Sequence, residues 1–282
     1  MRLNKYAILI AVFWVSFTYA NPLQQVRDFT SEQLSDNLFV LKSTGSNTNV
    51  GIFMGETFIL LIDPFVGNAN NTKLVSAIRK LSDKPIKYII NTHSHSDHIG
   101  ANSFYIELGA DVISNRNGQF YFNNELISSE DKYTIDVGNE KLDLLHFISH
   151  TTDDVIVHFR KNNIIFMGDT YMHDTYPHAY AGGSKGQFEV INKTLSLSND
   201  STKLITAHGR FLTKKAEFLS FKEKSELWYE KINALNEQGE SMEVIVRNEE
   251  LINISKMFRP FSLGYFEQQV RKTVVAERLI SK

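Results

Sequence analysis

The chain has 282 residues, of which 42% are hydrophobic and 12% aromatic, with 30 Lys and Arg residues against 32 Asp and Glu residues. This composition supplies a sizeable apolar core and excludes a disordered chain or a collagen-like fibre. Because the chain has no cysteine, it also excludes disulfide scaffolds, thiolate metal sites and cysteine nucleophiles, so any chemistry must use His, carboxylate, hydroxyl or Lys side chains.

Residues 1–20 have the features of a secretory signal peptide. Arg2 and Lys5 provide a basic start, residues 6–17 are mostly apolar, and Ala20 is a small residue that signal peptidase accepts. The apolar run is shorter than the roughly 20 residues that a membrane span needs. We therefore expect cleavage after Ala20, an exported protein that is periplasmic or secreted, and no integral membrane span after cleavage. The alternative is an uncleaved N-terminal anchor. Cleavage would leave a mildly acidic chain, which disfavours nucleic-acid partners.

The rest of the chain alternates strand and helix patterns. Short apolar runs between Gly, Ser and Asn clusters predict a strand meander at 38–41, 50–54 and 58–63. A helical spacing over 70–81 and a strand at 86–90 then complete a β-α-β unit. Further strands are expected at 111–114, 142–148, 155–159, 164–167 and 203–206, with a helix over 188–197. The charged helical patterns at 216–235 and 266–279 predict C-terminal helices packed on the core.

Metal-binding side chains follow several of these strands. Residues 93–100 read HSHSDHIG, with three imidazoles and one carboxylate within six residues. Imidazole and carboxylate are the usual zinc ligands where cysteine is absent, and one tight turn can direct them at two neighbouring ions. His150, Asp169 and His208 also follow apolar runs, so the strand ends are expected to converge on one rim. The competing interpretation is a solvated polar loop.

This pattern resembles the metallo-β-lactamase-fold superfamily. The matching stretches are Thr92–Gly100, His150–Thr151, Gly168–Thr170 and Ala207–Gly209, in the family's order, and the meander that ends in Asp63 and Pro64 is similar to the family's opening. The resemblance covers about residues 38–210. It implies an α/β fold, a four-layered αββα sandwich with a binuclear metal site at one edge of the paired sheets. It leaves the predicted C-terminal helices at 211–282 unexplained, and we expect them to extend the same domain of residues 21–282.

The resemblance also implies a role for each site residue. The first metal would be bound by His93, His95 and His150, the second by Asp97, His98 and His208, and Asp169 would bridge them. Two zinc ions are the expected cofactors, with iron or manganese as alternatives. Asp97 or Asp169 would accept or relay the proton of the attacking water. Asp63 would either hold a ligand imidazole or form a strand-end turn before Pro64.

Other histidines and aromatics carry weaker signals. Tyr176 and His178 lie in an aromatic-rich segment after Asp169 and could contact a substrate, and the alternative is that they are packing residues. His146 and His158 fall within apolar strand patterns, which favours locally hydrogen-bonded imidazoles over metal ligands.

The predicted function is hydrolysis of a small-molecule substrate, namely an ester, thioester, lactone or amide, by a hydroxide that two zinc ions activate. By resemblance, an Asp at position 169 is typical of glyoxalase II-like thioesterases, lactonases, phosphodiesterases and unassigned exported hydrolases. Alternatives are β-lactamase activity, an iron-dependent enzyme similar to persulfide dioxygenases, and a non-catalytic module on the same fold that binds metal or a partner. The sequence assigns neither the individual substrate nor the oligomeric state.

Overall fold

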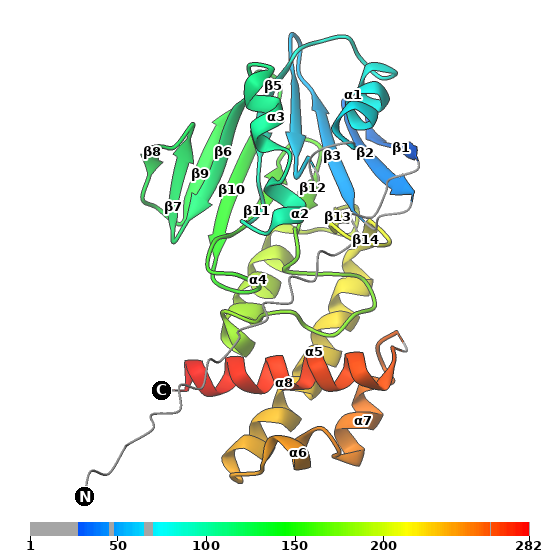
Figure 1. The fold of residues 1–282 in the computed structure, drawn as a ribbon, viewed down its shortest axis with the longest axis vertical. Helices are drawn as coiled ribbons and strands as arrows, with labels where there is room; N and C mark the ends of the chain where they lie inside the picture. Colours follow the sequence, from blue (N-terminus) through cyan, green and yellow to red (C-terminus); the bar gives the residue numbers. More distant parts are fainter. Residues whose placement is uncertain (1–27, 45–47, 65–69, 260, 282) are drawn as a thin grey trace, which may run out of the picture.

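The computed structural model describes residues 28–44, 48–64, 70–259 and 261–281 (Figure 1). The expected signal peptide at 1–20 lies outside the described residues. In the parts of the chain that the structure describes, no helix is both long and apolar enough to cross a bilayer.

The first sheet has eight strands in chain order. They are β1 (Asp28–Ser35), β2 (Leu38–Thr44), β3 (Asn49–Met54), β4 (Ile59–Ile62), β5 (Ile86–Ile90), β6 (Asp111–Arg116), β7 (Gln119–Phe122) and β8 (Glu125–Ser128). Helix α1 (Asn71–Arg79) connects β4 to β5, and the short helices α2 (Ser96–Ile99) and α3 (Asn102–Glu107) connect β5 to β6. Because a helical connection returns the chain to the same end of the sheet each time, β4, β5 and β6 are parallel. The strands β4 and β5 therefore end at the same edge of the sheet.

The second sheet has six strands. Their order is β14 (Leu212–Lys214), β13 (Lys203–Ile205), β12 (Ile164–Phe166), β11 (Asp154–Phe159), β10 (Lys141–Phe147) and β9 (Lys132–Asp136). Helix α4 (Gly183–Leu197) joins β12 to its parallel neighbour β13, while β10 and β12 are both antiparallel to β11. Strands β10, β12 and β13 therefore point the same way and end at one edge.

Side-chain alternation along the strands builds the layers. In β11, Val155 and Val157 face the core between the sheets, while Ile156 belongs to the core on the other face. Helices α1 and α3 cover the outer face of the first sheet, where Leu74 and Tyr105 are fully buried. Helix α4 and the long helix α5 (Lys215–Glu237) cover the second sheet. This arrangement confirms the expected αββα sandwich (Figure 1).

The C-terminal helices extend the sandwich at one end. Helices α6 (Met242–Ile245) and α7 (Glu249–Ser255) follow α5, and α8 (Leu263–Ile280) crosses α5 and packs against α4 (Figure 1). The side chains of Asn248 and Ser262 accept backbone hydrogen bonds at the starts of α7 and α8, which fixes where these helices begin. The helices predicted at 216–235 and 266–279 are therefore confirmed as parts of α5 and α8.

Candidate metal centre

Five strand ends bring the predicted residues to one edge of the sandwich. In the first sheet, Asp63 follows β4 and the stretch 93–98 follows β5. In the second sheet, His150, Asp169 and His208 follow β10, β12 and β13. Because each sheet directs its parallel strands toward this edge, residues far apart in the sequence form two groups that could each hold a metal ion.

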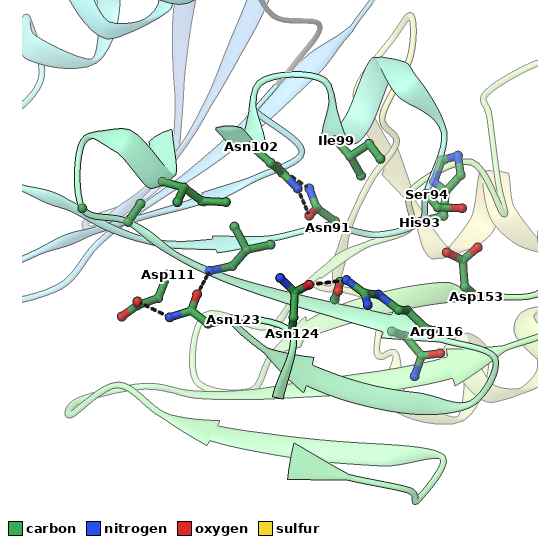
Figure 2. Close-up of a pocket in the computed structure, with 16 residues that line it drawn as sticks. Asn91, His93, Ser94, Ile99, Asn102, Asp111, Arg116, Asn123, Asn124 and Asp153 are labelled. Atoms are coloured by element: carbon green, nitrogen blue, oxygen red, sulfur yellow. Dashed lines mark hydrogen bonds between the residues drawn. The ribbon is translucent and has the colours of Figure 1, made fainter. Parts of the chain in front are cut away.

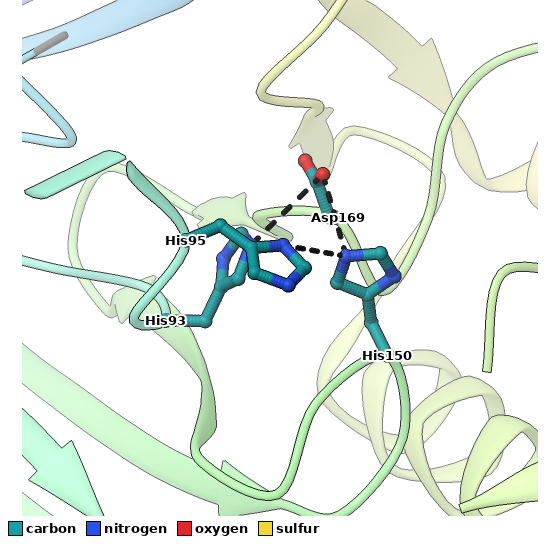
Figure 3. Close-up of side chains that lie close together, drawn as sticks. All are labelled: His93, His95, His150 and Asp169. Carbon is teal, nitrogen blue, oxygen red and sulfur yellow. Dashed lines mark hydrogen bonds and ion pairs between the residues drawn. The ribbon is translucent and has the colours of Figure 1, made fainter. Parts of the chain in front are cut away.

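The first group contains three imidazoles and one carboxylate (Figure 3). The Nε2 atom of His93 lies 3.0 Å from Nδ1 of His95, which lies 3.2 Å from Nε2 of His150. His93 and His150 are buried, whereas His95 is exposed. Burial lowers the pKa of His93 to about 2, so its imidazole is neutral and keeps the lone pair that a metal needs.

The second group contains Asp97, His98 and His208. The Oδ2 atom of Asp97 lies 3.8 Å from Nε2 of His98 and 3.3 Å from Nε2 of His208. Burial alone would lower the pKa of His98, but the carboxylates of Asp63 and Asp169 raise it to about 9. The surrounding carboxylates therefore favour a positive charge at this position.

Asp169 lies between the two groups and faces both. Its Oδ2 atom is 4.0 Å from His93 Nε2 and 3.6 Å from His150 Nε2. Its Oδ1 atom is 3.6 Å from His98 Nε2 and 3.2 Å from His208 Nε2. Burial would raise the pKa of Asp169, but His208 and His98 hold it well below its ordinary value, so the group is a carboxylate.

Unsatisfied buried atoms test whether these residues fit metal ions. Within the described residues, nine buried polar side-chain atoms lack a hydrogen-bond partner, and they include Nε2 of His98 and Oδ1 of Asp169. Such orphaned atoms are rare in proteins because they lose their hydration without compensation. Both belong to the two groups, whose imidazole nitrogens and carboxylate oxygens match the donors that zinc prefers in a site without cysteine. The residues therefore fit a pair of divalent metal ions.

Asp63 anchors the loop that carries the HSHSDHIG motif. It has a left-handed backbone, with a φ of 50°, directly after β4. Its carboxylate accepts hydrogen bonds from the backbone N–H of Thr92 at 2.8 Å and from the Thr92 hydroxyl at 2.6 Å. The same carboxylate lies 2.9 Å from Nδ1 of His98. The structure thus decides between the two expected roles, because this strand-end Asp also holds an imidazole of the second group.

The two residues expected in a substrate loop occupy other places. The ring of Tyr176 is 3% exposed and stacks on Trp228 with centroids 4.9 Å apart. Phe258, Phe261 and Phe266 complete its surroundings, so Tyr176 packs in the helical core and not over the two groups. His178 is also buried, but its carbonyl oxygen lies 2.8 Å from Nδ1 of His150. A carbonyl only accepts, so Nδ1 carries the proton and His150 Nε2 is left facing the first group.

His146 and His158 lie outside both groups. Nε2 of His146 is 3.0 Å from the carbonyl oxygen of Thr152, a local hydrogen bond of the expected kind. His158 is buried on β11, where burial lowers its pKa below the ordinary value.

A pocket of about 460 Å³, lined by both polar and apolar residues, adjoins the first group (Figure 2). His93 and Ser94 line one side of it, and Asp153 lies next to them. The pocket extends to Asn115 and Arg116 at the end of β6, where the buried Nδ2 atom of Asn115 has no hydrogen-bond partner among the described residues. Sequence reasoning missed these residues, because isolated Asn, Arg and Asp residues carry no spacing that indicates a common pocket.

Comparison with known proteins places this fold and site in one family. The sequence model described as the Metallo-beta-lactamase superfamily matches residues 43–184, which is half of the chain. A hydroxyacylglutathione hydrolase of Prochlorococcus marinus (strain MIT 9301) is 24% identical over 62% of this chain and 69% of its own length. A metallo-beta-lactamase type 2 of Elizabethkingia meningoseptica is 24% identical over 62% of this chain and 80% of its own length.

Solved structures share the fold at low sequence identity. A metallo-beta-lactamase family protein of Thermus thermophilus has a TM-score of 0.62 and is 13% identical, over 88% of this chain and 95% of its own. The sec-alkylsulfatase Pisa1 of Pseudomonas sp. has a TM-score of 0.67 and is 13% identical, over 89% of this chain and 50% of its own. The sequence match, the two-sheet sandwich and the two side-chain groups at its edge agree, and the chain belongs to the metallo-beta-lactamase superfamily.

Proposed function

We propose that this protein is an exported hydrolase that uses two zinc ions to cleave a small ester, thioester, lactone or amide. Membership of the superfamily and the relatives named as hydrolases support a metal-dependent hydrolase. The observation that carries the choice of two ions is the position of Asp169, whose two carboxylate oxygens face different groups of ligand atoms. A single ion would contact only one of these oxygens and would leave the other facing the imidazoles of the second group alone.

The ligand assignment follows the two groups. The first ion would be held by His93, His95 and His150, the second by Asp97, His98 and His208, with Asp169 between them. Such a pair of ions, when bound, lowers the pKa of water and polarises the oxygen of the bond to be cleaved.

Asp97 is the better placed of the two candidate carboxylates to move a proton. Its side chain is 40% exposed, whereas that of Asp169 is 9% exposed. Burial would raise the pKa of Asp97, but the hydrogen bond from His208 and the charge of His98 lower it to about 2. Asp97 is therefore ionised at neutral pH and partly exposed, so it can accept a proton at the site. Asp169 has the enclosed position suited to bridging.

The names of the relatives point to two classes of substrate. Several are named hydroxyacylglutathione hydrolases, which supports a thioester, and one is named a metallo-beta-lactamase, which supports a cyclic amide. The absence of cysteine separates this chain from lactamases with a cysteine ligand, so we favour the thioester, ester and lactone classes over the β-lactam.

Elemental analysis of the purified chain tests the metal assignment. We expect two zinc ions per chain, and we expect His95→Ala to lose zinc because it removes a donor of the first group. His158→Gln is the matched control, since it replaces a buried histidine outside both groups. One iron per chain, or full zinc retention by His95→Ala, would contradict the proposal.

A substrate panel tests the reaction. The zinc-loaded chain is assayed with a glutathione thioester, a lactone, an aryl ester and a penicillin, each with Asp97→Asn as the inactive control. Activity on any of the first three that disappears in Asp97→Asn supports the proposal. Activity on the penicillin alone would instead assign a β-lactamase.

Export is tested by expressing the full chain in a bacterium with two membranes and separating the cell fractions. We expect the protein in the periplasm or medium, with Asn21 as its first residue, because cleavage is expected after Ala20. Retention in the cytoplasm with Met1 intact would contradict this part of the proposal.

A further inference from the structure

We propose that the C-terminal helix α8 positions His150 for metal binding by holding residues 178–186, here called the support segment. This inference rests on the proposed metal site, in which His150 is a ligand of the first ion. Residues 263–280 of α8 lie beyond the stretch 43–184 that the family model matches.

The support segment contacts His150 directly. The Nδ1–H group of His150 donates to the carbonyl oxygen of His178 at 2.8 Å, and the ring of Tyr180 lies 5.3 Å from the His150 ring. The backbone N–H groups of Ala181 and Gly182 donate to the carbonyl oxygen of Ser149 at 2.9 and 2.8 Å. The support segment therefore fixes both the backbone beside His150 and the direction of its imidazole.

The support segment packs so closely against the loop that carries His150 that neither can shift without the other. A Cβ atom at Gly182 or at Gly186 would lie 2.0 Å from the carbonyl oxygen of Ile148. The glycines let the support segment lie against the backbone of the His150 loop. Any displacement of the support segment is consequently transmitted to His150.

Helix α8 in turn holds the support segment at three points. The Tyr265 hydroxyl lies 3.2 Å from Nε2 of His178, and the Tyr180 hydroxyl donates to Oε1 of Gln269 at 2.5 Å. The backbone N–H and hydroxyl of Ser184 donate to the carboxylate of Glu277 at 2.5 and 2.7 Å. Gln269 and Glu277 are 2% and 3% exposed. The hydrogen bonds that these two side chains accept are therefore shielded from water, and this shielding strengthens them.

The physical consequence is a chain of contacts from α8 to one ligand. Groups that orient a metal-bound imidazole through its other nitrogen typically contribute about 10–100-fold to metal affinity. Here that group is the His178 carbonyl, a loop atom whose own position depends on the Tyr265 and Gln269 side chains. Tyr265 and Gln269 are thus positioning residues, because they act on the ion only through the support segment.

The double variant Tyr180→Phe/Tyr265→Phe tests the inference, because it removes two hydroxyls and keeps both rings. Zinc binding is measured by competition with a chromophoric chelator, and cobalt(II) absorption reports the geometry of each site. We expect the dissociation constant of one of the two zinc ions to rise about tenfold or more while the other changes less than about threefold. Arg271→Gln is the matched control on α8, since the Arg271 side chain is 43% exposed and pairs with Glu243 on α6.

The outcomes separate this inference from the proposed function. A wild-type chain that binds no zinc overturns both. A wild-type chain with two zinc ions, and a double variant with both dissociation constants and the cobalt spectrum unchanged, overturns the inference alone. Equal weakening of both sites together with a lower melting temperature also overturns it, because α8 then acts on overall stability. Should the double variant fold poorly, Tyr265→Phe alone must still show a smaller loss at the same single site.

Discussion

The Nδ1 atom of His98 in α2 lies 2.9 Å from the carboxylate of Asp63, which directly follows β4, the parallel neighbour of β5. The same carboxylate binds the backbone and hydroxyl of Thr92, so one side chain sets the start of the HSHSDHIG loop and the orientation of its third imidazole. His98 Nε2 is thereby directed at Asp97 and Asp169.

Asp63→Asn should weaken the second metal site. Asn tolerates the left-handed backbone at position 63 and has nearly the same size, so the substitution removes the charge that His98 faces and replaces one of the two accepting oxygens by an NH2 group. We expect the dissociation constant of one zinc ion to rise about 10–100-fold, with kcat falling in parallel. Chelator competition measures this change. Unchanged affinity for both ions would show that the Asp63 charge does not act on the site.

Gly186→Ala should destabilise the fold even though alanine normally stabilises a helix. A glycine within a helix is about 1 kcal/mol less favourable than alanine, so the ordinary expectation is a gain. At Gly186 in α4, however, the new Cβ would lie 2.0 Å from the carbonyl oxygen of Ile148, and we expect a net loss of about 1–3 kcal/mol.

Gly264→Ala in α8 is the matched control for the expected loss of stability at Gly186. A Cβ at Gly264 meets nothing within 4 Å, so alanine there should leave the unfolding free energy unchanged or raise it. Chemical denaturation of both variants provides the comparison. A gain in stability at Gly186 equal to that at Gly264 would contradict the close packing of α4 on the His150 loop.

Asp143 should make the free energy of unfolding depend on pH in the acidic range. Its carboxylate on β10 accepts bonds from Thr134 and from Arg160, and it pairs with Lys132 at 3.1 Å. Burial would raise the pKa of Asp143, but the Arg160 and Thr134 hydrogen bonds lower it to about 2. Because the folded-state pKa is depressed, the stabilisation is present above the ordinary pKa of 3.8 and is lost as pH falls toward 2.

The measurement compares wild type with Asp143→Asn by denaturation at several pH values. We expect a difference of about 1–2 kcal/mol at pH 7, since Arg160 and Lys132 are partly exposed, and almost none near pH 2. Asp136→Asn, in an exposed pair with Lys141, should have little effect at any pH. A constant difference across the range would rule out the charge as the cause.

Tyr176 should behave as a core residue. Tyr176→Ala removes a ring that stacks on Trp228, and we expect a loss of about 3–5 kcal/mol in unfolding free energy. Tyr176→Phe keeps the ring, should lose about 1 kcal/mol, and should leave KM unchanged. Thermal melts and steady-state kinetics on the same samples separate the two roles. A several-fold higher KM in a fully stable Tyr176→Phe variant would instead support the substrate contact that the sequence suggested for Tyr176.

The sequence was sufficient to predict most of the sandwich. Strands β3, β5, β10 and β11 were located because buried strands have dense apolar runs, and α5 and α8 because charged residues recur at helical spacing. Strand β1 was not predicted, since six of its eight residues are not buried and its composition is polar. Strands β7, β8, β9 and β14 were also missed, because each has only three to five residues and none has the dense aliphatic run of a buried strand.

The sequence by itself determined the chemistry of the site, and the tertiary structure decided its geometry. Imidazoles and carboxylates in HSHSDHIG and after later apolar runs already indicate a metal site, because such side chains are costly to gather without a cation. The place of Asp169 between the groups was expected by resemblance, and the folded chain supplies its distances; only the folded chain places Tyr176 in the core and α8 behind His150. These placements depend on contacts between residues tens of positions apart, and local periodicity carries no information about which distant surfaces meet.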